Sequence, residues 1–456
     1  MMGLGANGVT GEDRRRIIRG TLHSFLIQGF SVLLVFVSNL FLVRSTDANS
    51  YGLYVHIFNW VSILSVVVIG GRDDLVLAQL PRYNEEQHSR LVGLIRAVNR
   101  WIFGAALVVG GLFVALLFLV RIGTLSGHQS LFRIGMIAVY LTACLSLNQL
   151  ILQALNHIRL SQIIEKLVKP LLLIGCIGLL RLLAIPFDAR ALVILSCVVL
   201  GICCGGVLWL VYRKLQRYAP PGTVAERLGA PGEPPGRAAE PPEQLSGKTF
   251  YFFAVSLFNL LSTKITMLIL PVFAPQAAIG IFNIGYRFAD LLIFPFFLMH
   301  TVLPQLFARH VVTGRAYTQS LFSESNKLMT LLSLPLLLLN LLAGKFLLHL
   351  FGPEFGEGYT AMLYISLAQF LFSLFGPANT ILMMQDREKY SAACLLAYVL
   401  VLLATSCWLI PGGGITGGAL AILISSGVYN ILLAVVTYRL FGICSPFFAW
   451  LVRRRV

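Results

Sequence analysis

The sequence predicts an all-α polytopic membrane protein of about twelve transmembrane helices, in two six-helix bundles related by a pseudo-two-fold axis along the membrane normal. Three observations support this fold class: the composition, the length of the apolar runs and an internal repeat. Of the 456 residues, 57% are hydrophobic and 12% are charged, whereas a soluble domain has about 25% charged residues. So few charged residues cannot cover a hydrophobic core with a hydrated surface, and the chain is therefore expected to lie in a bilayer.

Apolar runs of the length needed to cross a bilayer, about 20 residues, recur along the chain. Six precede a polar interruption and six follow it. In the first half they are residues 20–43, 52–71, 92–120, 133–155, 163–183 and 191–212. In the second half they are residues 249–270, 277–307, 327–342, 360–384, 391–410 and 417–438.

The interruption at residues 213–248 is rich in proline, glycine, alanine and glutamate. It has too few large apolar side chains to offset the entropy of ordering, so a disordered cytoplasmic linker is expected. The linker divides the chain into an N-terminal six-helix bundle (1–212) and a C-terminal six-helix bundle (249–440). A basic cytoplasmic tail (441–456) follows the second bundle.

The net charge of +16 is expected to set the membrane topology, and nucleic-acid binding is not expected. The basic residues fall in short loops between apolar runs, where they mark the cytoplasmic side. With a cytoplasmic N-terminus, about 27 of the 35 lysines and arginines lie inside. Both termini are therefore expected in the cytoplasm, and no outer loop is long enough to fold as a domain.

An internal repeat relates the two halves at an offset of 228 residues. Residues 50–54 (SYGLY) fall on 278–282 (AIGIF), Arg159 falls on Arg387, and residues 191–195 fall on 419–423. Each match alone is weak in an apolar sequence, but three matches on one ungapped diagonal favour duplication. Six helices return a chain to its starting side, so the halves are expected to be parallel repeats.

Polar residues on four of the predicted helices keep to single helical faces. Polar groups at membrane depth are costly, and they usually face a cavity or a partner helix. The faces are Ser24, Gln28, Ser31 and Ser38 in the first helix, His56, Asn59 and Ser62 in the second, Ser256, Asn259, Thr263 and Thr266 in the seventh, and Asn283, Arg287 and Asp290 in the eighth. Steps of three and four residues keep one face, so these faces are predicted to line a central cleft.

Eight residues are the candidate substrate-binding residues of this cleft. They are Arg287, Lys264, Asp290, Asn283, Asn259, Asn59, His56 and Gln28. Arg287 is expected about ten residues, or roughly 15 Å, below the outer end of its helix and hence near the midplane. A guanidinium and an ammonium facing a wet cleft suit phosphate or carboxylate groups, so an anionic cargo is expected.

Other interpretations of these residues stay open. Arg287 and Asp290 have the i, i+3 spacing of an intrahelical ion pair, which would neutralise both charges. Lys264 has the position of a lysine that extends to the membrane interface. For His56, packing or hydrogen bonding inside the fold is the alternative to a place in the cleft.

Four segments carry a resemblance to a known family. They are residues 48–54 (ANSYGLY), 279–282 (IGIF), 350–355 (LFGPEF) and 410–417 (IPGGGITG). Through them the sequence resembles the polysaccharide transporter branch (O-antigen flippase, Wzx type) of the multidrug/oligosaccharidyl-lipid/polysaccharide (MOP) exporter superfamily. The resemblance covers nearly the whole chain apart from the linker. It implies a fold like that of the multidrug (MATE) exporters, in which helices one, two, seven and eight line the cleft.

The resemblance also implies a function. Such proteins carry undecaprenyl-pyrophosphate-linked oligosaccharide, the repeat unit of O-antigen, capsule or exopolysaccharide, across the bacterial cell inner membrane by alternating access. The implied partners are the lipid-linked oligosaccharide, membrane lipids and the glycan polymerase machinery. The charged candidates Lys264, Arg287 and Asp290 match no motif of the family and rest on the residues alone.

Three other functions compete with this one. A peptidoglycan lipid flippase of the same superfamily usually has more than the twelve helices expected here. A cation-coupled multidrug exporter of the same superfamily would favour a buried carboxylate in the first half, and the first helix has none. A membrane glycosyltransferase or polymerase is suggested by Asp73 and Asp74, but their expected cytoplasmic position disfavours it. Without a P-loop, or cysteines at metal-ligand spacing, no cofactor is expected, and a transporter is favoured over an enzyme.

Overall fold

The structure is a computed structural model, and it is described here for residues 29–73, 76, 80, 88–119, 129–155, 157–183, 188–218, 246–296, 315–385, 387–443, 445 and 447. All regular secondary structure in these ranges is helical. Nine helices there are long and apolar enough to cross a membrane. These observations confirm the predicted class of an all-α, multi-pass membrane protein.

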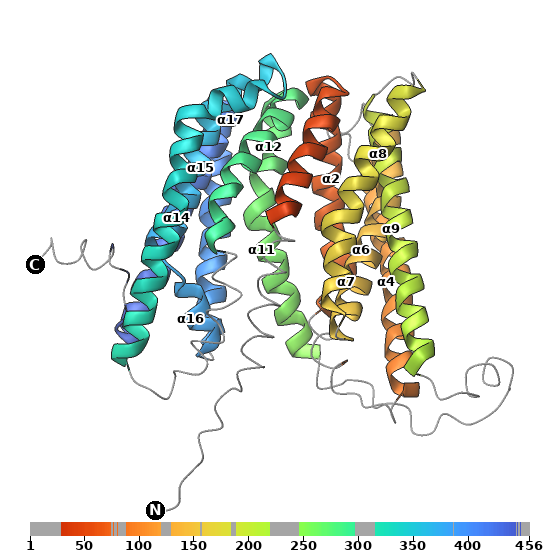
Figure 1. The fold of residues 1–456 in the computed structure, drawn as a ribbon, viewed down its shortest axis with the longest axis horizontal. Helices are drawn as coiled ribbons and strands as arrows, with labels where there is room; N and C mark the ends of the chain where they lie inside the picture. Colours follow the sequence, from red (N-terminus) through yellow and green to blue (C-terminus); the bar gives the residue numbers. More distant parts are fainter. Residues whose placement is uncertain are drawn as a thin grey trace, which may run out of the picture.

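The helices up to Tyr218 build one lobe of the molecule (Figure 1). A helix at Gly29–Arg44 comes first. It is followed by α2 (Ala48–Ile69), α4 (His88–Leu119), α6 (Gln129–Ala154) and α9 (Ala189–Tyr218). Between α6 and α9, three pieces follow one another without a break: α7 (Ile158–Ile163), a π-helix (Ile164–Val168) and α8 (Lys169–Leu182). The side chains of α2, α4, α6 and α9 share one hydrophobic core.

The second lobe contains the remaining helices and a second core. Its elements are α11 (Ser246–Phe273), α12 (Gln276–Asp290), a 3-10 turn (Leu291–Ile293), α14 (Arg315–His349), a 3-10 turn (Pro353–Gly358), α15 (Tyr359–Phe375), α16 (Ala378–Met384) and α17 (Glu388–Phe441). Within α17 the chain folds back at Gly414, which has φ 52° and ψ −129°. A Cβ on Gly417 would lie 2.1 Å from the Leu409 carbonyl oxygen. This element is therefore two antiparallel helices, as the two predicted spans 391–410 and 417–438 require.

The helices extend beyond the apolar runs that predicted them. The fifth span begins at Ile158 and not at residue 163, and the ninth begins at Arg315 and not at residue 327. Hydropathy detects only the part of a helix that is apolar, whereas the polar turns at its ends continue the same hydrogen-bond ladder.

The expected linker is also shortened at both ends. The helix α9 continues to Tyr218 and α11 begins at Ser246, so residues 219–245 remain between them. These residues lie outside the described part of the chain, as do Gln28, the start of the first span and most of the basic tail. The disorder of the linker stays a prediction.

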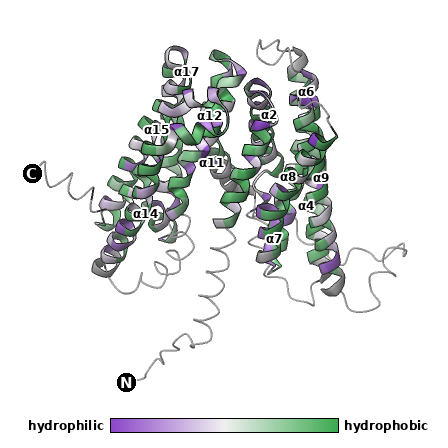
Figure 2. Cartoon of the chain, turned by 45° about the horizontal axis from the view of Figure 1, so that its top comes forward, coloured by the Kyte–Doolittle hydropathy of each residue, from purple (hydrophilic) through white to green (hydrophobic). Residues whose placement is uncertain are grey.

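The outer faces of both lobes are apolar. Figure 2 shows hydrophobic colour over most of the helix surface, with hydrophilic residues near helix ends and on α7. Large side chains such as Leu112 on α4 and Leu342 on α14 are more than half exposed. A contiguous apolar exterior of this extent suits lipid and not water.

The two lobes meet where α2 and α12 both begin, at the upper end of Figure 1. Gly52 of α2 lies so near α12 that a Cβ would be 1.8 Å from the Gln276 carbonyl oxygen. A Cβ on Gly280 would be 2.9 Å from the Tyr51 ring. Asn49 accepts a hydrogen bond from the Ala277 amide at 3.2 Å. We call this contact the closed end.

The closed end is built from the repeated segments themselves. Gly52 and Gly280 are 228 positions apart (280 − 52), and so are Asn49 and Ala277 (277 − 49). Equivalent positions of two parallel repeats meet each other only close to the axis that relates them. The contact therefore places the pseudo-two-fold axis between α2 and α12, in agreement with the predicted repeat.

One further hydrogen bond joins the lobes at the closed end, and two others within the first lobe support it. Arg181 of α8 donates to the Arg44 carbonyl oxygen at 2.6 Å. Arg44 in turn donates to the carbonyl oxygen of Leu350, which follows α14, at 2.7 Å. At the start of α2, Asp47 accepts the Ser50 amide at 3.1 Å, and hydrogen bonding from Ser50 lowers the pKa of Asp47. These contacts fix the entry of α2 against the second lobe.

A methyl group at Gly52 should part the lobes. In Gly52→Ala the Cβ meets backbone, which cannot rotate away, so we expect α2 and α12 to separate. The measurement is disulfide formation between cysteines placed at Asn49 and Ala277 in a background without native cysteines, and the yield should fall several-fold. Gly205→Ala is the matched control, because the space around Gly205 is open. An unchanged yield in Gly52→Ala would contradict the closed-end geometry.

Candidate functional site

A cavity of about 380 Å³ lies between the lobes. Its walls come from the Gly29–Arg44 helix, α2, α6, the fifth span, α9, α11 and α12. We call it the polar cavity because of its polar lining, which comprises Ser38, Asn39, Tyr51, Tyr54, Asn59, Ser62, Thr142, Glu165, Lys169, Ser196, Lys264, Asn283 and Arg287. Such a concentration of polar groups inside a membrane protein is typical of a substrate path.

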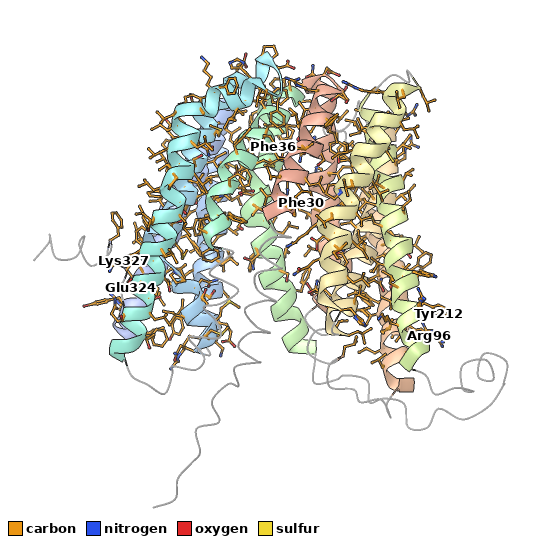
Figure 3. All side chains as sticks on the ribbon, viewed as in Figure 1. Phe30, Phe36, Arg96, Tyr212, Glu324 and Lys327 are labelled. Carbon is orange, nitrogen blue, oxygen red and sulfur yellow. The ribbon has the colours of Figure 1, made fainter. Side chains whose placement is uncertain are left out.

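A second cavity of about 230 Å³ lies between the Gly29–Arg44 helix and α12. Phe36 of that helix helps to line it, and Figure 3 shows Phe30 and Phe36 along the helix in the middle of the molecule. Most of its other lining residues are apolar, among them Phe288, Phe294 and Phe351. We call it the apolar cavity. Arg287 lines both cavities, so this residue lies where the polar and apolar spaces adjoin.

The structure brings five of the eight candidate residues to these cavities. Asn59, Lys264, Asn283 and Arg287 line the polar cavity, and Asp290 lines the apolar cavity. They span both lobes, since Asn59 belongs to α2 and the others to α11 and α12. Lys264 thus lies in the cavity wall. This position disfavours the alternative in which its side chain extends to the membrane interface. The binding roles of all five stay predictions.

Two polar contacts across the lobes set the orientation of the amides. Asn283 of α12 donates to the Tyr51 hydroxyl of α2 at 2.8 Å. Asn59 of α2 donates to the sulfur of Met267 in α11 at 3.6 Å. Both asparagines are buried, so these bonds reduce the cost of burying their amides.

Two of the other candidates do not line the cavities, and the third lies outside the described residues. His56 is 2% exposed, and its Nε2 accepts a hydrogen bond from Trp60 at 3.2 Å. Its ring packs edge-on against Phe132 of α6. For His56 the structure thus agrees with the alternative of packing and hydrogen bonding inside the first lobe, and it does not place the side chain in the cleft. Asn259 is exposed away from both cavities, and Gln28 lies outside the described residues.

Sequence reasoning missed Lys169 and Glu165, which line the polar cavity. In the predicted span 163–183 Lys169 lies six residues after the first residue (169 − 163), whereas in the structure the helical run begins at Ile158. Lys169 is therefore eleven residues into it (169 − 158), or roughly 16 Å along the axis. The π-helix Ile164–Val168 immediately precedes it, and π-turns often occur at functional sites. The available signal was the charged i, i+4 pair beside Pro170.

The polar cavity has an excess of positive charge. Lys169, Lys264 and Arg287 line it together with one carboxylate, Glu165. All three cations belong to the lining of this one cavity, so a bound anion would meet them together. None of the three forms an ion pair with a carboxylate in the described part of the chain. By contrast, Lys327 and Glu324, on the outer side of α14 in Figure 3, pair at 2.8 Å.

Arg287 and Asp290 do not form the intrahelical pair that their spacing allows. Asp290 Oδ1 instead accepts a hydrogen bond from Gln369 Nε2 of α15 at 3.1 Å. Asp290 thus has the Gln369 amide as its hydrogen-bond partner, and Arg287 is in ion-pair contact with no carboxylate in the described part of the chain.

Buried polar side chains hold the break that follows Asp290. The helix α12 passes into a 3-10 turn at Leu291–Ile293, just before Pro295, and proline cannot continue the helical ladder. Asn340 of α14 donates to the Phe288 carbonyl oxygen at 3.2 Å. Ser333 of α14 donates to the Leu292 carbonyl oxygen, also at 3.2 Å. These bonds satisfy carbonyls near the break and fix the end of α12, the helix that carries Arg287.

No family model matches the chain, and no curated protein matches its sequence. Its fold is nevertheless shared with solved transporter structures. An inward-facing conformation of a multidrug resistance MATE family transporter of the MOP superfamily superposes with a TM-score of 0.68 at 12% identity, over 90% of this chain and 94% of that chain. The lipid II flippase MurJ, in an inward closed conformation, superposes with a TM-score of 0.69 at 13% identity, over 90% and 86%.

A third similar structure is the MATE multidrug transporter DinF-BH. It superposes with a TM-score of 0.61 at 15% identity, over 96% of this chain and 98% of that chain. The chain therefore has the two-lobed fold of MOP-type transporters. At these identities the likeness establishes the fold alone.

Cysteine accessibility should separate Asn59 from His56, one helical turn apart on α2. We expect a cysteine at position 59 to react with a small, water-soluble methanethiosulfonate, because Asn59 lines the polar cavity. A cysteine at position 56 should react at least about tenfold more slowly, because the first lobe buries it. Mass spectrometry of the full-length protein measures both rates. Equal rates would contradict the placement of the cavity.

Proposed function

We propose that the chain is a flippase that moves undecaprenyl-pyrophosphate-linked oligosaccharide across the bacterial inner membrane by alternating access. One observation carries the proposal. Lys169, Lys264 and Arg287 line a polar cavity between two lobes, without ion-pair partners among the described carboxylates. An apolar cavity adjoins it at Arg287. A lipid pyrophosphate combines the two chemistries that these cavities provide.

The cations suit a pyrophosphate group. A guanidinium binds phosphate oxygens through two parallel hydrogen bonds, and an ammonium adds a compact charge. Lys169 comes from the first lobe, and Lys264 and Arg287 come from the second. A pyrophosphate has enough acceptor oxygens to contact both lobes at once. Tyr54 and Ser196, which hydrogen-bond to each other at 3.2 Å, add hydroxyls suited to sugar.

The apolar cavity suits the start of the lipid chain. Its lining of Val32, Phe36, Phe288 and Phe294 offers apolar surface directly beside Arg287. The isoprene units next to a bound pyrophosphate would leave water there, which is favourable in proportion to the area buried. The headgroup and its attached carbon chain would then occupy neighbouring spaces.

Alternating access requires one end closed while the other admits substrate. The closed end at Gly52 and Gly280 is the end opposite to Tyr218 and Ser246, which flank the linker. The distribution of lysine and arginine favours a cytoplasmic linker and cytoplasmic termini, so the closed end would face outward. The inward conformations named for two similar structures support this assignment. Glycan polymerase machinery would use the cargo on the outer side.

A cation-coupled multidrug exporter is the second candidate. Glu165 and Asp290 at the cavities are the observation in its favour, because a carboxylate attracts a cationic drug or a coupling ion. The multidrug transporters among the similar structures share the fold. The excess of cations in the polar cavity opposes a cationic cargo, so we place this function second.

Removal of a cavity cation should weaken binding of a lipid pyrophosphate. We expect Arg287→Ala, Lys264→Ala and Lys169→Ala each to raise the Kd for undecaprenyl pyrophosphate by about tenfold or more, without a change for undecaprenol. Binding is measured on the full-length protein in nanodiscs. Lys345→Ala is the control, since Lys345 is an exposed lysine of α14 that lines neither cavity.

The same assay distinguishes the two candidates. A wild-type protein that binds a cationic rhodamine dye more tightly than the pyrophosphate lipid would favour the multidrug exporter. Equal affinity of the wild type for undecaprenyl pyrophosphate and undecaprenol would reject the anionic cargo. In cells, the Arg287→Ala and Lys264→Ala changes together should abolish most of the export of surface glycan.

A further inference from the structure

Asp290 is the group most able to neutralise Arg287. It follows Arg287 by three residues on the last turn of α12, and both side chains are exposed to the apolar cavity. Opposite charges at this spacing lie on one helical face and commonly approach each other. An internal ion pair here would compete with an anionic ligand for the guanidinium. The structure nevertheless has no ion pair between the two residues.

Gln369 holds the carboxylate in this arrangement. Its side chain is 5% exposed, and Nε2 donates to Asp290 Oδ1 at 3.1 Å. Its neighbours on the same face of α15 are Ser366 and Ser373, at steps of three and four residues. Ser366 accepts a hydrogen bond from Asn340, and Ser373 shares one with Ser333. The stretch of α15 that bears Gln369 is thus attached to α14 on both sides.

Gln369 differs from the other polar residues at this interface in what it binds. Asn340 and Ser333 donate to the backbone carbonyl oxygens of Phe288 and Leu292, so they hold the main chain of α12 in place. Gln369 donates instead to a side chain that lines a cavity. Asn340 and Ser333 therefore attach α12 to α14 even without Gln369.

We propose that Gln369 is a positioning residue, which keeps the Asp290 carboxylate away from Arg287 so that the guanidinium remains available to a phosphate-bearing ligand. This inference deepens the proposed function and rests on it for the identity of the ligand. Gln369 itself does not contact the ligand. It sets the charge that the ligand meets at Arg287.

Replacement of the amide and rescue by a second change test the inference. Gln369→Met keeps the length of the side chain but removes the donor, so Asp290 turns to Arg287. We expect the Kd of the full-length protein for undecaprenyl pyrophosphate to rise by about tenfold. The double variant Gln369→Met/Asp290→Asn has no carboxylate to divert, and its Kd should return to within about twofold of the wild type. Gln149→Met, at a buried glutamine of α6 outside both cavities, should bind as the wild type does.

The rescue separates positioning from a purely structural role. An unchanged Kd in Gln369→Met would overturn the inference. A raised Kd that Asp290→Asn does not restore would overturn it too. Such a result would indicate a packing defect at α15, which does not depend on the charge at position 290. Restoration by Asp290→Asn is the result that supports it.

A second measurement needs no ligand. Phenylglyoxal modifies arginine side chains that are not engaged in ion pairs, and mass spectrometry reports the rate at Arg287. We expect the rate to fall several-fold in Gln369→Met and to recover in the double variant. If the wild type shows no preference for the pyrophosphate lipid, the proposed function fails, and this rate alone decides the inference. An unchanged rate in Gln369→Met would refute the inference even where the lipid binds.

Discussion

The close approach of α2 and α12 at the closed end is the contact on which the arrangement of the lobes depends. Gly52 and Gly280 allow the two main chains to approach so closely that any Cβ would collide. The hydrogen bonds that Asn49 accepts and that Asn283 donates across the lobes form only at that separation. Each cavity between the lobes is bounded by α2 or α12. The cavities therefore exist because two glycines allow the helices to converge at one end.

The same contact shows why the fold was predictable from sequence. Segments 50–54 and 278–282 matched at a fixed offset because both are needed at one place, the axis between the lobes. Apolar runs identified the spans, since the membrane imposes a length on each of them. The ends of the helices were less predictable. Ile158 and Arg315 begin helices whose first turns are polar, and hydropathy gives no indication of a polar turn that continues a membrane helix.

The site was predictable only in part. Arg287, Lys264, Asn283 and Asn59 were predicted to face a cavity because a polar side chain at membrane depth is rare and costly, and all four line the polar cavity. His56 is also a polar residue at membrane depth, but it hydrogen-bonds to Trp60 inside the first lobe. Helical periodicity does not distinguish a residue that faces a cavity from one that faces a buried partner. Lys169 was missed because it lies only six residues into the predicted span 163–183, whereas the helical run begins at Ile158 and places Lys169 deeper. Gln369 reached Asp290 through tertiary packing, which leaves no local pattern.

The position of Arg287 in the walls of two cavities has a consequence for selectivity, if it binds phosphate as proposed. A soluble phosphate compound would gain the charge interaction but leave the apolar cavity unfilled, and an uncharged isoprenoid would fill that cavity but leave the cations without a counterion. Each abundant competitor in the cell thus satisfies half of the requirement. Discrimination of this kind depends on the junction between headgroup and hydrocarbon and not on the sugars, so one such protein would tolerate variation in the glycan it carries.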